Sequence, residues 1–130
     1  CIVGASFGGY AAGMGLASTP ELYRCGISIN GVLDMKLFDR SVMWRNKYNQ
    51  ALTNESRNLK EVSPYHLRKK IDDPLMLIVG EKDSVVEPKH SYKMNKAMSK
   101  KKQAVEMLKL PDGEHWRTIE KNEIIMFNKH

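Results

Sequence analysis

Residues 1–10, which read CIVGASFGGY, carry the pattern that decides the fold of this chain. An apolar run leads into Ser6 and small residues follow it, which is typical of a strand, a sharp turn and a helix. Such a turn forces the serine into a strained backbone conformation. It also predicts that Gly4 and Gly8 lie where strand and helix pass too close for side chains, with Gly9 relieving the crowding further. The stretch therefore predicts an exposed, nucleophilic serine at the end of a strand.

Strands and helices alternate beyond this turn. The run L-M-L-I-V at 75–79 is continuously apolar, as in a parallel strand buried on both faces. Residues 32–73 are irregular and favour helix. The predicted helices span about 7–18, a segment opened by Pro88, and 118–127; the predicted strands span 23–30, 75–79 and 105–110. This alternation predicts an α/β fold for residues 1–130, with a mainly parallel sheet flanked by helices.

The chain is basic, with 21 Lys and Arg against 15 Asp and Glu, a net charge of +6. Much of the excess lies at five lysines, Lys93, Lys96, Lys100, Lys101 and Lys102. A basic cluster can attract nucleic acid or acidic surfaces. No aromatic residues are interleaved for base stacking, so we expect the solvated face and end of a helix, and no nucleic-acid partner.

The two cysteines, Cys1 and Cys25, lie beside apolar runs, and we expect buried free thiols. Neither a disulfide framework nor a metal-ligand spacing is visible, so we expect no metal and no cofactor. No apolar run approaches membrane-spanning length, and no membrane partner is expected. These features leave both a cytoplasmic and a periplasmic location open.

A serine at such a turn predicts an acid and then a histidine, each in the loop after a later strand. Asp83 lies in the loop after 75–79, and His115 lies in the loop after 105–110. Because the carboxyl ends of parallel strands meet at one edge of a sheet, we expect both near Ser6. Other acids and histidines lack this combination of loop position and chain order; they are Glu81, Glu87, His66, His90 and His130.

Each of these residue types suits one step of acyl transfer. The Ser6 oxygen would attack a carbonyl carbon once its proton is taken. The His115 imidazole can accept that proton near neutral pH and return it to the leaving group. Asp83 would hold the imidazole in the useful tautomer, and the backbone N–H of Phe7 would be one oxyanion donor. The spacing therefore predicts a hydrolytic triad.

Five segments of the chain resemble the prolyl oligopeptidase family of serine peptidases, particularly its acylaminoacyl-peptidase and dipeptidyl-peptidase-like branches. They read GASFGGYAA, YRCGISINGVLD, SPYH, DPLMLIVGEKDSVVEP and LPDGEHW. The resemblance implies the C-terminal half of an α/β-hydrolase catalytic domain. It also implies peptides or N-acylated peptides as substrates, cleaved through an acyl-enzyme. Relatives usually carry Tyr at the position of Phe7, a change that alters the polarity of the pocket.

The resemblance further implies strands and an N-terminal β-propeller that these 130 residues do not include. The family's second oxyanion donor would lie in that part, and losing one such donor costs roughly 10²–10³ in rate. A strand at 1–5 without an outer neighbour would also be an exposed edge, prone to pairing. We therefore expect a fragment that is inactive alone and that self-associates or pairs with the missing N-terminal part.

Two other functions are compatible with the sequence. An esterase or lipase that acts on small acyl esters would use the same triad, and the motifs do not separate it from a peptidase. In either enzyme we expect the stretch 37–48, with Phe38, Trp44 and Tyr48, to contribute to a substrate pocket. The third candidate, a non-catalytic basic module, predicts salt-sensitive binding of nucleic acid through residues 93–102.

Overall fold

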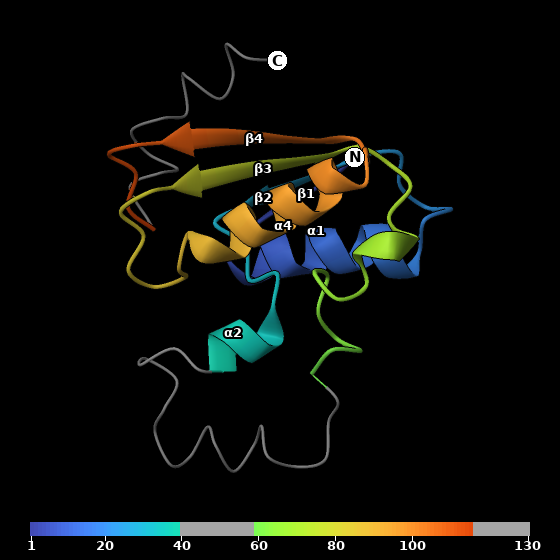
Figure 1. Cartoon of the computed structure of the whole chain (residues 1–130), viewed down its shortest axis with the longest axis horizontal. Coiled ribbons are helices and arrows are strands. Elements are labelled where there is room, and N and C mark those ends of the chain that lie inside the picture. The colour runs from blue at the N-terminus through green and yellow to red at the C-terminus, as the bar shows by residue number, and fades with distance from the viewer. Residues whose placement is uncertain (40–58, 116–130) are drawn as a thin grey trace.

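The computed structural model describes residues 1–39 and 59–115 (Figure 1). In these ranges four strands form one sheet in the order β1-β2-β3-β4, and every neighbouring pair is parallel. The strands are β1 (Ile2–Ala5), β2 (Gly26–Ile29), β3 (Leu75–Gly80) and β4 (Val105–Leu110). The helices are α1 (Phe7–Ser18), α2 (Met35–Asp39), α4 (Lys89–Lys100) and the 3-10 helix η2 (Arg68–Lys70). The predicted parallel α/β sheet is confirmed, and the helix expected at 118–127 lies outside the described residues.

The core lies between the sheet and the two long helices, which cover the same side of the sheet in Figure 1. Leu16 of α1, Leu77 of β3, and Met94 and Met98 of α4 are fully buried in one cluster. Full burial of one such side chain contributes roughly 1.5–3 kcal/mol. Because the helices connect parallel strands, the carboxyl ends of all four strands lie at one edge of the sheet.

Strand β3 is the central buried strand that its apolar run predicts, since Leu75, Leu77, Ile78 and Val79 are each at most 2% exposed. Strand β2 begins at Gly26, three residues later than the predicted start at Tyr23. The neighbouring segment explains the difference. The Gly26 N–H donates to the carbonyl of Pro74, and Pro74 has no N–H with which to extend the ladder backwards.

The expectation of buried thiols at Cys1 and Cys25 is wrong, because a disulfide joins these residues across β1 and β2. Their Cα atoms lie 4.5 Å apart, Cys1 is exposed and Cys25 is half-buried. The parallel register pairs Ile2 with Gly26, so the residues before them, Cys1 and Cys25, also lie opposite each other. The spacing of the cysteines along the chain does not reveal this register.

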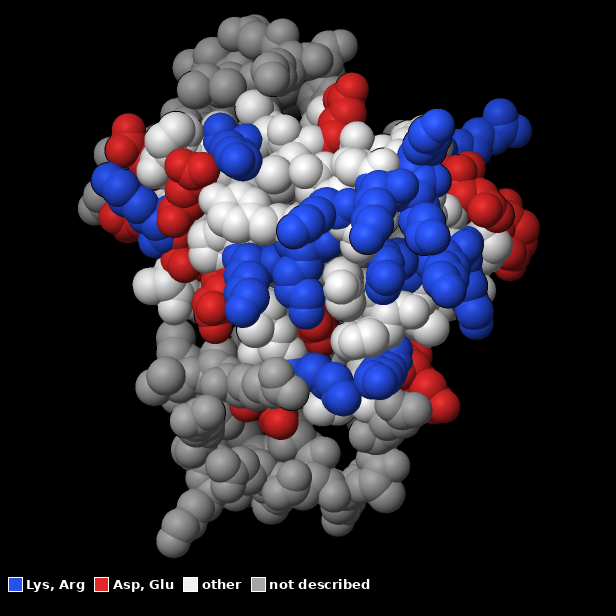
Figure 2. Space-filling model, viewed as in Figure 1, with Lys and Arg blue, Asp and Glu red and all other residues white. Residues whose placement is uncertain are grey.

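The lysines near the C-terminal end of α4 form the exposed basic face that we expected. Figure 2 shows Lys and Arg side chains gathered there, and Lys96, Lys100 and Lys101 are all exposed. Lys93 differs from them, because its ammonium group pairs with the buried carboxylate of Asp34. Among the described residues, no helix is long and apolar enough to cross a membrane.

Candidate active site

Ser6 occupies the sharp turn between β1 and α1. Its φ is 57° and its ψ is −116°. A residue with a side chain rarely adopts a positive φ. The Ser6 N–H donates to the Ile29 carbonyl at 2.9 Å, and the Ser6 carbonyl accepts from the Tyr10 N–H at 3.2 Å. These bonds tie both sides of the turn to regular structure, and the predicted backbone strain is confirmed.

Two of the three glycines around Ser6, Gly4 and Gly9, lie where a side chain would collide with neighbouring atoms. A Cβ added at Gly4 would collide with the carbonyl group of Gly8. A Cβ added at Gly8 itself would meet nothing within 4 Å, so the expectation that Gly8 must lack a side chain is wrong. Gly9 has the close contact instead, since a Cβ there would lie 2.6 Å from the Ser28 hydroxyl and 2.7 Å from the Cα of Gly31. The crowding falls on the carbonyl of Gly8 and on the Cα of Gly9.

Of the three residues expected to form a triad, Ser6 and Asp83 each lie within hydrogen-bonding distance of His115. The Nδ1 atom of His115 is 2.7 Å from Oδ2 of Asp83, and its Nε2 atom is 3.1 Å from Oγ of Ser6. Asp83 and His115 are 6% and 5% exposed. Ser6 follows β1, Asp83 follows β3 and His115 follows β4, so all three lie beyond the carboxyl edge of the sheet.

Backbone amides fix the orientation of the Asp83 carboxylate. Its Oδ1 atom accepts from the N–H groups of Val85 at 2.8 Å and Val86 at 2.9 Å. Hydrogen bonds to an ionised acceptor are stronger than neutral ones. The second oxygen, Oδ2, is thereby directed at the imidazole of His115.

This contact also sets the tautomer of a neutral His115. A carboxylate can only accept, so the short contact with Asp83 assigns the imidazole proton to Nδ1. The Nε2 atom then carries a lone pair toward Ser6, whose hydroxyl donates to it. Such an arrangement can take a proton from Ser6 and later release it.

Phe7 begins α1 directly after Ser6. The N-terminal end of a helix favours negative charge. The Phe7 ring is 51% exposed and packs edge-on against Phe38 at a centroid distance of 5.6 Å. A developing negative charge next to Ser6 would therefore meet a favourable field.

An apolar cluster lies beside the elbow. Phe38, Val32 and Val86 are buried together, and Tyr10 and Met35 pack against them. Of the residues expected to contribute to a substrate pocket, Phe38 lies in this cluster, whereas Trp44 and Tyr48 lie outside the described residues. The apolar positions that directly follow the end of β2 were the available signal for this cluster.

A buried histidine, His90, was not assigned a role from the sequence. It is 2% exposed, and its Nδ1 atom accepts from the N–H groups of Leu33 and Asp34, both at 3.1 Å. Burial lowers the pKa of His90 to about 4, although the Asp34 carboxylate acts in the opposite direction. A neutral His90 thus ties helix α4 to the loop that follows β2.

Asp34, in that loop, is a buried carboxylate with several partners. Its Oδ1 atom accepts from the Lys36 N–H at 2.9 Å and lies 3.8 Å from Nδ1 of His66, while Oδ2 pairs with Lys93. Burial raises the pKa of Asp34, but the hydrogen bonds from Lys93 and the Leu37 N–H, together with the charges of Lys93 and His66, outweigh it and leave the pKa below its ordinary value. The cluster holds the loop that carries Val32 and leads into helix α2, which carries Phe38.

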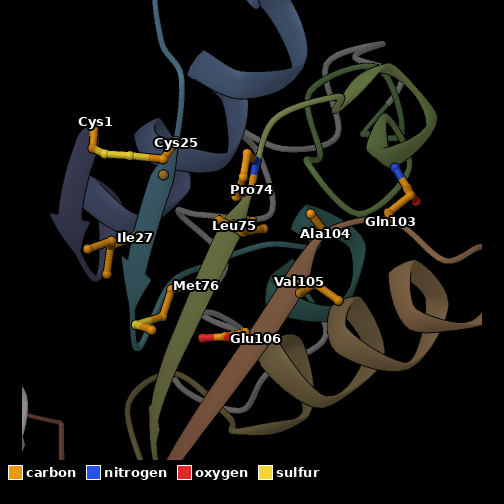
Figure 3. Close-up of a pocket in the computed structure, with 11 residues that line it drawn as sticks. Cys1, Cys25, Ile27, Pro74, Leu75, Met76, Gln103, Ala104, Val105 and Glu106 are labelled. Atoms are coloured by element: carbon orange, nitrogen blue, oxygen red, sulfur yellow. A yellow bond between two sulfur atoms is a disulfide. The ribbon is translucent and has the colours of Figure 1, made fainter. Parts of the chain in front are cut away.

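The opposite edge of the sheet has a different character. A hollow of about 470 Å³ lies at the amino ends of the strands, where Figure 3 shows Cys25, Ile27, Pro74 and Met76 around it. Its walls are mainly apolar, and no convergent set of polar groups marks it as a reactive site. Within residues 1–39 and 59–115, no group of three or more His, Cys, Asp or Glu residues could hold a metal ion.

A parallel sheet with a serine at a strand-to-helix elbow, followed by an acid and a histidine after later strands, defines part of the α/β-hydrolase fold. The chain belongs to the prolyl oligopeptidase family, which it matches along residues 1–130. It is therefore homologous to serine peptidases.

Individual relatives agree with this family. The chain is 31% identical over 124 residues to dipeptidyl aminopeptidase BIII of Pseudoxanthomonas mexicana, covering 88% of this chain and 18% of that protein. Its structure resembles an acylaminoacyl peptidase of Pyrococcus horikoshii, with a TM-score of 0.71, 26% identity, and coverage of 91% and 20% of the two chains. A puromycin-hydrolyzing peptidase of Mycobacterium tuberculosis has a TM-score of 0.76, 23% identity, and coverage of 87% and 18%. The chain thus spans about a fifth of the length of these relatives.

Proposed function

We propose that Ser6, His115 and Asp83 are the catalytic triad of a serine peptidase that hydrolyses oligopeptides or N-acylated peptides. The observation that carries the proposal is the continuous hydrogen-bond chain from Asp83 through His115 to Ser6. Homology to the family supports a peptide substrate. The names of the relatives, a dipeptidyl aminopeptidase and an acylaminoacyl peptidase, support short or N-blocked peptides.

In the proposed reaction, the Ser6 Oγ atom attacks the carbonyl carbon of the scissile bond while its proton passes to Nε2 of His115. Asp83 stabilises the imidazolium, and the Phe7 N–H donates to the oxyanion. The C–N bond then breaks, and Nε2 returns the proton to the leaving amine. Water attacks the acyl-enzyme by the same proton path, which releases the acid and restores the Ser6 hydroxyl.

The apolar cluster beside Ser6 suits a substrate side chain next to the scissile bond. Phe38 and Val32 are buried in it, and the Phe7 ring at its border is half exposed. Trp44 and Tyr48 remain part of the proposed pocket. Apolar walls with few polar groups are typical of small-molecule and side-chain pockets.

Residues 1–130 are proposed to be the C-terminal portion of the catalytic domain. Strand β1 lies at the edge of the described sheet, and Val3 on it is 58% exposed. An unpaired strand edge is a template for another strand. We propose that this edge pairs with an N-terminal part of the domain or with a second copy, and that the 130 residues alone are inactive.

A fluorophosphonate probe, which labels activated serines, tests the proposal in the full-length protein. Ser6→Ala should abolish labelling, while Ser99→Ala, at an exposed position of α4, should leave it unchanged. Labelling that survives Ser6→Ala would remove Ser6 from the nucleophile role. Rates on peptide nitroanilides against nitrophenyl esters then distinguish a peptidase from the alternative, an esterase.

A further inference from the structure

Asn30 lies at the carboxyl end of β2, between the segments that carry the three triad residues. It is 3% exposed, and its φ of 47° is in the left-handed region. Asparagine tolerates this region better than most residues with a side chain. The backbone here turns away from the sheet directly after Ile29, and the side chain stays in the interior.

The side chain of Asn30 bonds to the last residue of β3 and to the loop that follows β4. Its Oδ1 atom accepts from the Gly80 N–H at 2.7 Å, and its Nδ2 group donates to the His115 carbonyl at 3.3 Å. Its own N–H donates to the Ile78 carbonyl at 2.8 Å. One buried amide therefore joins the end of β3 to the backbone of the proposed base.

Each of these bonds leads to a triad residue in one further step. The Gly80 carbonyl accepts from the Asp83 N–H at 3.1 Å, so the start of the Asp83 loop is fixed at the residue that Asn30 holds. On the other side, the Ile29 carbonyl, next to Asn30, accepts from the Ser6 N–H. Asn30 thus contacts His115 directly. It is linked to Asp83 through Gly80, and to Ser6 through the neighbouring Ile29, by one further hydrogen bond each.

We infer that Asn30 is a positioning residue for the proposed triad, one that sets the distance of His115 from Asp83 and Ser6. The inference rests on the proposed function of these three residues. Its physical basis is that a carbonyl held by a buried amide fixes the backbone from which the imidazole projects. A misplacement of about 1 Å in a catalytic group can lower a rate about 100-fold.

Two substitutions separate the two bonds of the amide. Asn30→Asp keeps an oxygen for the Gly80 N–H but sets a second oxygen against the His115 carbonyl, which removes the donor. Asn30→Gly keeps the positive φ and removes both bonds. In the full-length protein we expect both variants to lower kcat and the rate of fluorophosphonate labelling by about 10- to 100-fold. KM should change little, and the pH profile of labelling should shift.

Gln103 provides a matched control at the other edge of the sheet. Its side-chain amide likewise joins two backbone groups, here both carbonyls, donating to Arg68 at 2.8 Å and to Ile71 at 2.9 Å. Gln103→Glu should lower the Tm but leave kcat and the pH profile unchanged. If lost stability alone lowered kcat, the Gln103 variant and the Asn30 variants would both show a lower kcat. If Asn30 positions the triad, only the Asn30 variants should show a lower kcat and a shifted pH profile.

The inference is overturned if either Asn30 variant folds, lowers the Tm as Gln103→Glu does, and keeps the wild-type kcat and pH profile. Should Asn30→Gly fail to fold, the more conservative Asn30→Asp decides by the same measurements. Loss of labelling in Ser6→Ala together with unaltered Asn30 variants would reject this inference alone. Labelling that persists in Ser6→Ala would instead reject the proposed function.

Discussion

The two ends of the same four strands carry different kinds of side chain. At the carboxyl edge, buried polar side chains such as Asp83, His115 and Asn30 make directed hydrogen bonds between loops. At the amino edge, a disulfide and an apolar hollow lie beside the strand starts. The difference is that the first edge carries the residues of the proposed triad, whereas the second edge carries a covalent cross-link between β1 and β2. Substitutions of the polar side chains at the first edge should affect rate, and loss of the cross-link at the second edge should affect stability.

The largest effect is expected from the Asp83 carboxylate. Asp83→Asn should lower kcat of the full-length protein by about 10⁴-fold. The asparagine amide that replaces the carboxylate can donate as well as accept, so it does not hold the His115 proton on Nδ1. The exposed carboxylate Asp112, which pairs with Lys82 at 3.2 Å, is the control. Asp112→Asn should change kcat less than about 2-fold, since exposed ion pairs contribute little. Equal kcat values for the two variants would contradict the proposed role of Asp83.

The elbow glycines should differ sharply in stability. Gly4→Ala places a methyl group against the Gly8 carbonyl, and we expect it to destabilise the protein by about 3 kcal/mol or more. Gly8→Ala enters open space within α1 and should be neutral or stabilise by up to about 1 kcal/mol. Urea unfolding of the two variants checks the difference. A destabilised Gly8→Ala would show that the crowding lies elsewhere than the structure indicates.

At the amino edge, reduction of the Cys1–Cys25 disulfide should affect stability without affecting the site. The bond closes a loop with a sequence separation of 24, for which chain entropy gives about 3 kcal/mol. Thermal unfolding of the full-length protein with and without reductant measures this loss. At a temperature well below the Tm, the fluorophosphonate labelling rate should not change. A labelling rate that falls with reduction would show that the two edges are coupled.

Acid should weaken the protein through His90, which lies on α4 between the two edges. Its pKa of about 4 in the folded chain is below the ordinary value of 6.5, so the unfolded chain binds more protons between these values. Stability is therefore complete above about pH 6.5 and declines, on the order of 2–3 kcal/mol, as the pH falls toward 4. Unfolding measured across this range is the test. His90→Asn, which keeps an acceptor for the Leu33 and Asp34 amides, should lack this part of the pH dependence.

The sequence predicted the features that depend on local pattern. The apolar runs located β3 and β4, the small residues after Ser6 located α1, and chain order selected Asp83 and His115. Because the strands are parallel and connected by helices, residues in the loops that follow them had to meet at one edge. The convergence of Ser6, Asp83 and His115 needed no knowledge of which side chains pack together.

The features that the sequence did not predict depend on contacts between distant segments. The Cys1–Cys25 disulfide follows from the register of β1 against β2. The buried roles of Asn30 and His90 follow from which carbonyls and amides lie opposite them, and this information is not carried by residue type. Gly8 was misassigned because the pattern identifies a crowded turn but not the atom that is crowded.

The spatial order of the strands repeats their order along the chain. During synthesis each strand can therefore add beside the one already in place, with no threading between earlier strands. Of the three residues of the proposed triad, Ser6 leaves the ribosome first and His115 last. A nascent chain that has not yet completed β4 would carry Ser6 without His115, the residue that we propose as its proton acceptor.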